Sequence, residues 1–297
     1  MRLDDQNESS NFEIQGPSRA GFGGGGGGLG LLGMLFPFVL SRFGCGGVVV
    51  LLIAVAIFGG FGSIGSLLGT GAGVDPTPRQ AGAQAGQQAL TPGQSTSLKV
   101  LGSTEAVWTR IFAADGKRYE PTILSFYDRN GQSGCGAAQS AMGPFYCPSD
   151  RKTYIDTTFF DEMKTRFDAP GDFPIGYIIS HEVGHHIQTI TGIADEVAAQ
   201  QARVGRAAGN ALQVKMELQA DCYAGVWAAN ARGLLEAGDV EEGMRAAAAI
   251  GDDTLQRESQ GTVVPESFTH GSSAQRQFWL QRGLQTGDWK QCDTFAS

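Results

Sequence analysis

The chain has 297 residues, enough for one large domain or two small ones. Its 44 glycines are about twice the usual share for a globular protein, and many of them fall in the first 75 positions. The net charge is −8, the pI is about 5.0 and no cluster of basic residues is present, so a nucleic acid is not expected as a partner.

The first 43 residues are polar and then very rich in glycine, with a run of glycines at 23–28. Such a segment cannot bury enough apolar surface to offset the entropy lost on ordering, so residues 1–43 are predicted to be disordered and cytoplasmic. Residues 29–40 are apolar but interrupted by glycine and proline, and too short to span a bilayer. We expect them at the membrane interface. If they crossed instead, the large domain would face the cytoplasm.

Residues 44–68 are predicted to form one transmembrane helix. No charged side chain occurs from residue 43 to residue 74, and a helix of about 20 apolar residues is enough to cross a bilayer. We expect a retained anchor rather than a cleaved signal peptide, because the apolar core begins far from Met1 and no compact basic region precedes it. The alternative is a buried core helix, which the glycines near the end of this stretch disfavour.

Residues 69–97 have the composition of a flexible linker, and residues 98–297 are predicted to form an α+β domain, mainly helical with a small β-sheet. The expected strands are 122–127 and 152–156. The expected helices are 107–112, 159–166, 173–191, 210–232, 239–251 and 272–284. The strand at 152–156 is either an edge strand, to which an extended peptide could add, or a plain core strand.

The most informative stretch reads I-I-S-H-E-V-G-H-H-I-Q at residues 178–188. His181 and His185 are four residues apart, so on a helix they lie on the same face and can share one metal ion. Glu182 lies about 100° round the helix, close enough to act as a base on a water at that metal. Apolar neighbours predict a buried helix, the alternative being a surface helix that carries histidines. Its expected start and stop signals are Asp172, Pro174 and Gly192.

The third ligand is expected from a later helix, because catalytic zinc usually takes three protein ligands. Glu217, in E-L-Q-A-D, is the best candidate, and Asp221 lies one turn further on the same face. Asp221 would accept a hydrogen bond from the distal nitrogen of a ligating histidine. The alternatives are Asp221 as the ligand, which its shorter reach disfavours, and two solvated helix charges with no metal.

Three more residues are candidates for the site. His186 points about 100° away from His185, so a structural or supporting role is expected rather than a bond to the metal. His270, in F-T-H-G-S-S-A-Q-R, could donate a hydrogen bond to a developing oxyanion, the alternative being a structural histidine. Arg276 could orient His270 or bind a substrate carboxylate.

Four cysteines, Cys135, Cys147, Cys222 and Cys292, follow the apolar stretch. An even number is consistent with two disulfides in an oxidising compartment. Of the three possible pairings we favour Cys135 with Cys147 and Cys222 with Cys292. Buried free thiols are the alternative.

Several motifs together resemble the bacterial putative neutral zinc metallopeptidase family. They are H-E-V-G-H-H-I-Q, E-L-Q-A-D-C-Y-A-G-V-W, I-G-D-D-x-L-Q, S-F-T-H-G-S-S-A-Q-R and the terminal C-D-T-F. The resemblance extends over nearly the full length, and its specific motifs follow Gly134. It implies a zincin-like fold of the gluzincin type, with one Zn²⁺ per chain bound by His181, His185 and Glu217.

The resemblance also implies that Glu182 is the catalytic base, that Asp221 supports a ligand and that His270 assists the transition state. We therefore expect a zinc-dependent endopeptidase acting on a peptide or protein substrate. The expected location is the bacterial inner membrane, through one helix in contact with lipid. A cytoplasmic N-terminus is favoured by the positive-inside rule, and a periplasmic catalytic domain by the cysteines.

Two other functions remain open at this stage. One is a membrane-tethered binding or assembly protein with a structural or vestigial metal site, which a fourth protein ligand such as His186 or Cys222 would favour. The other is a metallohydrolase of a different bond, such as an amide in cell-wall material. A groove for an extended peptide, rather than a closed pocket, would favour the endopeptidase.

Overall fold

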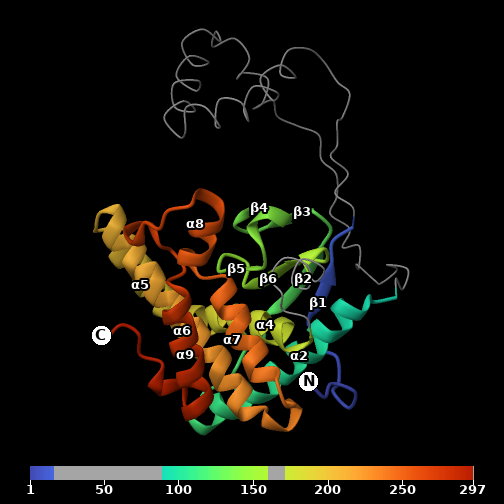
Figure 1. The fold of residues 1–297 in the computed structure, drawn as a ribbon. Helices are drawn as coiled ribbons and strands as arrows, with labels where there is room; N and C mark the ends of the chain where they lie inside the picture. Colours follow the sequence, from blue (N-terminus) through green and yellow to red (C-terminus); the bar gives the residue numbers. More distant parts are fainter. Residues whose placement is uncertain (17–88, 160–170, 297) are drawn as a thin grey trace, which may run out of the picture. The chain divides into compact units, whose positions relative to one another are not determined.

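The central helix, α4 (Phe173–Ile190), lies between a small sheet and a group of helices (Figure 1). The computed structural model describes residues 1–16, 89–159 and 171–296. The predicted transmembrane helix at 44–68 falls outside these ranges, as do most of the linker and of the helix expected at 159–166. No helix of the described ranges is both long enough and apolar enough to cross a membrane.

The main sheet has the strand order β1-β2-β6-β5. Its strands are β1 (Phe12–Ile14), β2 (Ile123–Tyr127), β5 (Phe145–Cys147) and β6 (Lys152–Asp156). The first two and β6 are parallel, whereas β5 pairs antiparallel with β6. The two predicted strands are therefore confirmed. However, β5 covers the side of β6 that was a candidate free edge, so the edge strand beside α4 is β5.

A separate hairpin, β3 (Asn130–Ser133) and β4 (Gly136–Gln139), is joined to β5 by the disulfide Cys135–Cys147. A second disulfide, Cys222–Cys292, joins the long helix of the domain to the C-terminal segment. Both are the favoured pairings. In each case the two Cα atoms lie less than 6 Å apart, at 5.8 and 5.6 Å, as a disulfide requires.

Residues 1–16 belong to the folded domain, which corrects the prediction that they are disordered. Phe12 lies opposite Leu124 in the parallel pairing of β1 with β2, and Lys152 Nζ donates to Glu13 Oε2 at 2.8 Å. The segment is short and polar, so its own sequence carries no strand signal. It is ordered by the edge of β2, a contact made with residues far along the chain.

The pairing of β1 with β2 also bears on the predicted membrane topology. A single crossing at 44–68 would place residues 1–16 and the domain that contains β2 on opposite sides of the bilayer. Strands that share backbone hydrogen bonds cannot be separated by about 30 Å of hydrocarbon. A cytoplasmic N-terminus, one crossing and a periplasmic domain are therefore incompatible with this sheet.

Helix α2 (Pro92–Ala114) begins well before the predicted start at residue 107, inside the predicted linker. Thr91 and Gln94 form a capping box, and Pro92 occupies the first turn. Leu98 and Trp108 are fully buried on its inner face. The capping signal T-P-G-Q is present in the sequence, but the surrounding Gly, Gln, Ser and Thr gave the segment the composition of a linker.

Five helices follow α4: α5 (Ile193–Gln201), α6 (Arg206–Asn230), α7 (Asp239–Ala249), α8 (Asp252–Gln260) and α9 (Ser273–Thr286). Three of them were predicted, whereas α5 and α8 were not. The missed helices are short and mostly exposed, with Val197 the one buried residue of α5 and Asp252 that of α8. Each helix is only nine residues long and carries few large apolar side chains, so the apolar periodicity that signals a helix is short in both.

The ends of α4 agree with the sequence in part. Pro174 lies in the first turn, and Gly192, just beyond the last turn, has φ +85°. Asp172 occupies the capping position but its side chain makes no capping hydrogen bond. Its backbone carbonyl instead accepts from the Gly176 N–H at 3.0 Å.

Close contact between α4 and α6 depends on a glycine. A Cβ atom added at Gly184 would lie 2.9 Å from Ala220 Cα and 3.1 Å from Ala220 O, both main-chain atoms that cannot move aside. Gly184 follows Glu182 and Val183 and precedes His185, so the two helices touch at the level of the histidines. A larger residue here would separate the helix of the histidines from the helix of Glu217.

We therefore expect Gly184→Ala to destabilise the fold by about 1–3 kcal/mol, the usual cost of overpacking a core. Gly209→Ala, on α6, is the matched control, because a Cβ there meets no atom within 4 Å. The control should gain up to about 1 kcal/mol from the higher helix propensity of alanine. The free energy of unfolding of both variants is measured by thermal unfolding. A Gly184→Ala protein as stable as the Gly209→Ala control would contradict the close helix contact.

Candidate metal centre

Two helices supply the candidate ligands. His181, Glu182 and His185 project from α4, and Glu217 and Asp221 from α6. Because residues four apart share a helix face, each helix turns its group toward the other across the contact at Gly184. His181, Glu182 and Glu217 are 6–7% exposed and Asp221 is fully buried.

The three predicted ligands come together at one point. His181 Nε2 lies 3.2 Å from Glu217 Oε2, and His185 Nε2 lies 3.5 Å from the same oxygen. A tetrahedral zinc ion holds nitrogen and oxygen ligands at about 2.0–2.1 Å, which places the ligand atoms about 3.3–3.4 Å from one another. The two distances to Glu217 Oε2 bracket this value, and all three ligand atoms lie within 4.8 Å of one another. These three are the one cluster of histidine, cysteine and acidic side chains with metal-binding geometry among the described residues.

Asp221 fixes the orientation of His181, as predicted from the helix spacing. Its Oδ1 accepts from His181 Nδ1 at 2.8 Å, so Nδ1 carries a proton and Nε2 is the nitrogen that faces Glu217. The alternative role of Asp221 as a ligand does not fit this position, because the carboxylate lies on the far side of the ring.

Arg276 and Tyr177 complete the surroundings of Asp221. Arg276 donates to both carboxylate oxygens, at 2.9 and 3.0 Å, and Tyr177 donates to Oδ1 at 2.6 Å. Burial alone would raise the pKa of Asp221, but the guanidinium of Arg276 and the ring of His181 hold that pKa below its usual value. Asp221 is therefore ionised and acts only as an acceptor.

Arg276 is a supporting residue of the site, as expected, but the group that it orients is Asp221 rather than His270. Its remaining hydrogen bonds go to Ile250 O and Tyr177 Oη, and its side chain is 2% exposed. A substrate carboxylate could not reach a guanidinium that is buried and already paired. Arg276 instead supports Asp221 and, through it, His181.

Gln188 is a site residue that the sequence analysis missed. Its Oε1 lies 2.9 Å from His185 Nδ1, the nitrogen that does not face Glu217. The available signal was its position three residues after His185, which places the two side chains on neighbouring parts of one helix face. In each of the two histidines, Nδ1 is hydrogen-bonded to a neighbouring side chain and Nε2 faces Glu217 Oε2.

Glu182 lies beside the three ligands with one oxygen unused. Its Oε2 is buried and has no hydrogen-bond partner among the described residues. Burial raises the pKa of its carboxyl group, and the two histidines oppose the rise. An unpartnered buried carboxylate oxygen is costly, so its presence indicates a place where a water or a substrate group binds.

His186 faces away from this point, as predicted. Its Nε2 donates to Glu120 O at 2.6 Å and its Nδ1 accepts from Tyr146 Oη at 3.1 Å, so it links α4 to the sheet side of the domain. Cys222 is held in a disulfide. Neither residue is a fourth ligand, and within the described ranges no other histidine, cysteine or acidic residue joins the cluster.

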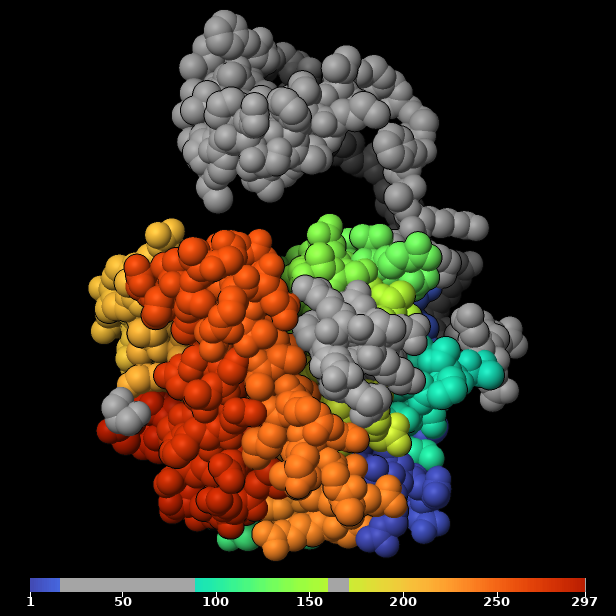
Figure 2. All heavy atoms as spheres, viewed as in Figure 1, coloured from blue at the N-terminus to red at the C-terminus, as the bar shows by residue number. Residues whose placement is uncertain are grey.

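The cluster opens into a cleft of about 750 Å³. One wall comes from residues 140–146, which lead into β5, and the other from α5, α8 and the loop that carries His270. Figure 2 shows atoms of the β3–β4 region, in green, beside atoms of the α8 region, in orange, on the face drawn there. The site therefore lies in a groove between two parts of the domain, not in a closed core cavity.

His270 lines this cleft, and a neighbouring aspartate holds it there. Asp252 Oδ1 is 3.2 Å from His270 Nδ1, and Asp252 Oδ2 accepts from the backbone N–H groups of Thr269, His270 and Gly271. The imidazole is about half exposed, at 51%. Asp252, within the motif I-G-D-D, was not recognised from the sequence as part of the site.

Charge accumulates at the cluster. Three buried carboxylates, Glu182, Glu217 and Asp221, lie near a single buried guanidinium. Burial alone would lower the pKa of His181, yet Asp221 and Glu217 outweigh it and raise the pKa to about 10. The site thus attracts positive charge strongly, as a site for a divalent cation must.

Comparison with known proteins agrees with this chemistry. The protein family described as putative neutral zinc metallopeptidase matches residues 1–295. The uncharacterized protein YpfJ of Escherichia coli (strain K12) is 44% identical over 306 aligned residues, covering 100% of this chain and 99% of YpfJ. The uncharacterized protein Rv2575 of Mycobacterium tuberculosis is 41% identical over 208 residues, 66% of this chain and 68% of Rv2575. No solved structure matches the chain. The protein belongs to the putative neutral zinc metallopeptidase family.

Proposed function

We propose that the protein is a zinc-dependent endopeptidase. The supporting observation is the convergence of His181 Nε2, His185 Nε2 and Glu217 Oε2 on one point, beside the unpartnered Oε2 of Glu182 and inside an open cleft. Three ligands with no fourth protein ligand among the described residues is the pattern of catalytic rather than structural zinc.

A zinc ion held there would polarise the scissile carbonyl and make a bound water more acidic. Glu182 is the general base: its free carboxylate oxygen takes a proton from the attacking water and later passes it to the leaving amine. Asp221 and Gln188 keep the proton of each histidine on Nδ1.

His270 stabilises the oxyanion in this proposal. Asp252 lies against Nδ1, so Nε2 is the ring nitrogen left to face a substrate, and an N–H at that position is a hydrogen-bond donor. His270 lines the same cleft as Glu182, so this N–H can serve a substrate bound there. A preorganised donor of this kind typically contributes about 10²–10³ in rate.

The substrate proposed is an extended peptide. In the described sheet, β5 is the last strand, so one of its edges makes no strand pairing, and Phe145 and Tyr146 of β5 line the cleft. An extended peptide can add to such an edge through main-chain hydrogen bonds, with its side chains directed alternately toward the cleft. An open groove favours an endopeptidase over hydrolysis of an isolated amide in cell-wall material.

Glu182→Gln tests the mechanism. The protein should retain one zinc per chain, because Glu182 is not a ligand, and its peptide cleavage should fall by at least about 10²-fold. Zinc is measured by elemental analysis and cleavage with a mixed peptide library. Glu241→Gln, an exposed glutamate on α7, is the matched control and should keep full activity. Cleavage at the wild-type rate by the purified Glu182→Gln protein would rule out this mechanism.

Glu217→Ala tests the metal site. The protein should lose its zinc on dialysis against metal-free buffer, because only the two histidines would remain as ligands. The same substitution at exposed Glu196, on α5, should leave zinc content unchanged. Full zinc occupancy after dialysis of Glu217→Ala would mean that the metal binds elsewhere.

The location of the protein is also a proposal. We propose that the protein is attached to a bacterial inner membrane through the apolar stretch 43–74, and that residues 1–16 and the sheet that they join lie on the same side of that membrane. The support is the pairing of β1 with β2, which joins the two flanks of this stretch in one sheet. Two disulfides favour the oxidising, extracytoplasmic side of a bacterial inner membrane.

This topology predicts a labelling result. In a Cys45→Ser background, single cysteines at exposed Ser10 and exposed Gln285 should react equally with a membrane-impermeant maleimide on intact spheroplasts. A lipid bilayer between the two positions would instead protect one of them. Labelling of Gln285→Cys together with protection of Ser10→Cys, which becomes reactive only after permeabilisation, would restore the single-pass arrangement.

A further inference from the structure

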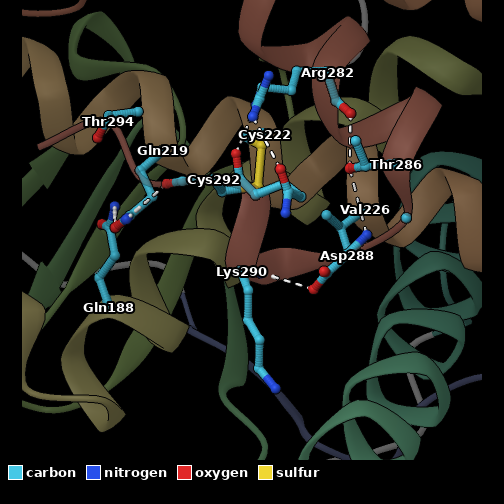
Figure 3. Close-up of a disulfide and its surroundings, with 12 residues drawn as sticks. Gln188, Gln219, Cys222, Val226, Arg282, Thr286, Asp288, Lys290, Cys292 and Thr294 are labelled. Carbon is cyan, nitrogen blue, oxygen red and sulfur yellow. Dashed lines mark hydrogen bonds between the residues drawn. A yellow bond between two sulfur atoms is a disulfide. The ribbon is translucent and has the colours of Figure 1, made fainter. Parts of the chain in front are cut away.

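A chain of hydrogen bonds leads from the candidate ligand His185 to the C-terminal disulfide. His185 Nδ1 lies 2.9 Å from Gln188 Oε1, Gln188 Nε2 lies 3.1 Å from Gln219 Oε1, and Gln219 Nε2 lies 3.0 Å from Cys292 O. Figure 3 shows both glutamine side chains and the disulfide of Cys292 with Cys222. Both glutamines are almost completely buried, at 0% and 4% exposure.

The direction of this chain follows from its carbonyl ends. Cys292 O can only accept, so the amide nitrogen of Gln219 faces it and Gln219 Oε1 faces Gln188. Gln188 Nε2 also donates to Met216 O at 2.7 Å, which again only an amide nitrogen can do. Gln188 Oε1 must therefore face His185, and His185 Nδ1 must carry the proton.

This direction has a consequence for the metal site. A neutral imidazole with its proton on Nδ1 has its lone pair on Nε2, the atom 3.5 Å from Glu217 Oε2. Were either glutamine reversed, its amide oxygen would face a main-chain carbonyl, Met216 O for Gln188 and Cys292 O for Gln219, and two acceptors cannot share a hydrogen bond. The two glutamines thus set the tautomer and ring orientation of His185, as Asp221 does for His181, without adding a charge.

We propose that Gln188 and Gln219 are positioning residues for the metal ligand His185, and that the Cys222–Cys292 disulfide holds the acceptor on which they depend. This inference rests on the proposed zinc site. Cys222 follows Gln219 by three residues on α6, so the disulfide ties Cys292 to the same helix that carries Gln219 and Glu217. Without that tie, a buried amide N–H of Gln219 would lose its acceptor.

Thr294 adds a second attachment of the C-terminal segment to α6. Its Oγ1 donates to Lys215 O at 2.7 Å. The carbonyl of Cys292 is therefore held on α6 from both directions along the chain. The disulfide thereby acquires a role in the metal centre, although neither sulfur lies among the ligands.

Three variants of the full chain test the glutamines, read out as zinc affinity in competition with a chelator and as the visible spectrum of the Co²⁺-loaded protein. Gln188→Leu removes the acceptor for His185 and should weaken zinc binding by about 10–100-fold and change the Co²⁺ spectrum. Gln277→Leu is the matched control, because Gln277 Nε2 also donates to a backbone carbonyl, Met244 O, and takes no part in the chain from His185 to Cys292. It should leave both readings unchanged.

Gln188→Glu separates positioning from a merely structural role. A glutamate can still accept from His185 Nδ1 but can no longer donate to Met216 O or to Gln219 Oε1, and the protein should bind zinc within about threefold of wild type or more tightly. Equal weakening in Gln188→Leu and Gln188→Glu would mean that only the bonds donated by Gln188 matter and not its acceptance from His185, and would overturn the proposal. Wild-type affinity and spectrum in Gln188→Leu would overturn it as well.

The disulfide has its own test. Replacing Cys222 and Cys292 together by serine should weaken zinc binding on the order of tenfold, while serine at both Cys135 and Cys147 should not. Circular dichroism checks that each variant is folded. If Gln188→Leu does not fold, Gln188→Met, an unbranched variant of similar length, replaces it in the test of the glutamines. Unchanged zinc affinity without Cys222–Cys292 would remove the disulfide from the proposal.

These results are separable from those on the proposed function. Zinc that binds tightly to a protein without peptidase activity would refute the endopeptidase and leave the affinity comparison of the Gln188 variants intact. Wild-type cleavage and zinc binding in Gln188→Leu would refute only the present inference.

Discussion

The approach of α4 to α6 at Gly184 is the constraint on which the site depends. Two histidines one turn apart define a line along one helix, and a third ligand must come from a different part of the chain. Glu217 reaches both Nε2 atoms because no side chain stands between the helices at the level of Ala220. The distance between the axes of α4 and α6 thus determines whether the two Nε2 atoms and Glu217 Oε2 lie close enough to bind one metal ion.

Bringing these helices together also concentrates charge. Glu182, Glu217 and Asp221 are buried with one compensating cation, Arg276, so two negative charges remain when both histidines are neutral. A divalent cation would balance them. Without one, the same field draws a proton onto the histidines, which is why the pKa of His181 rises despite burial. A positive charge between the ligands therefore stabilises the site, and metal and proton compete for that place.

The sequence predicts the parts of the site that depend on the geometry of one helix. The spacings of His181 with His185 and of Glu217 with Asp221 needed only the period of an α-helix, and the structure brings these residues together as expected. The partners of Arg276, the role of Asp252 and the chain from Gln188 to Cys292 join residues that lie far apart in the sequence. No local pattern specifies such contacts, so they could not be read from one sequence.

The errors in the fold have the same origin, with one exception. Strand β1 forms only because β2 offers an edge, and α5 and α8 bury too little apolar surface to produce a periodic pattern. The start of α2 is different, because Thr91 and Gln94 carry a local signal. There the composition of the surrounding segment was given more weight than the cap, although the cap is the more specific physical interaction.

The two histidines are oriented by different chemistry, and the charge balance gives a reason. Asp221 brings a negative charge to His181, and Arg276 neutralises it at close range. No second arginine or lysine lies against His185 in the described structure, so a carboxylate in place of Gln188 would add a buried charge that only the metal could balance. An amide orients the ring without that charge, but an amide can reverse, and its direction must be fixed by a further acceptor. The chain of hydrogen bonds from His185 ends at the main-chain carbonyl of Cys292, which can only accept. The Cys222–Cys292 disulfide holds that carbonyl against α6.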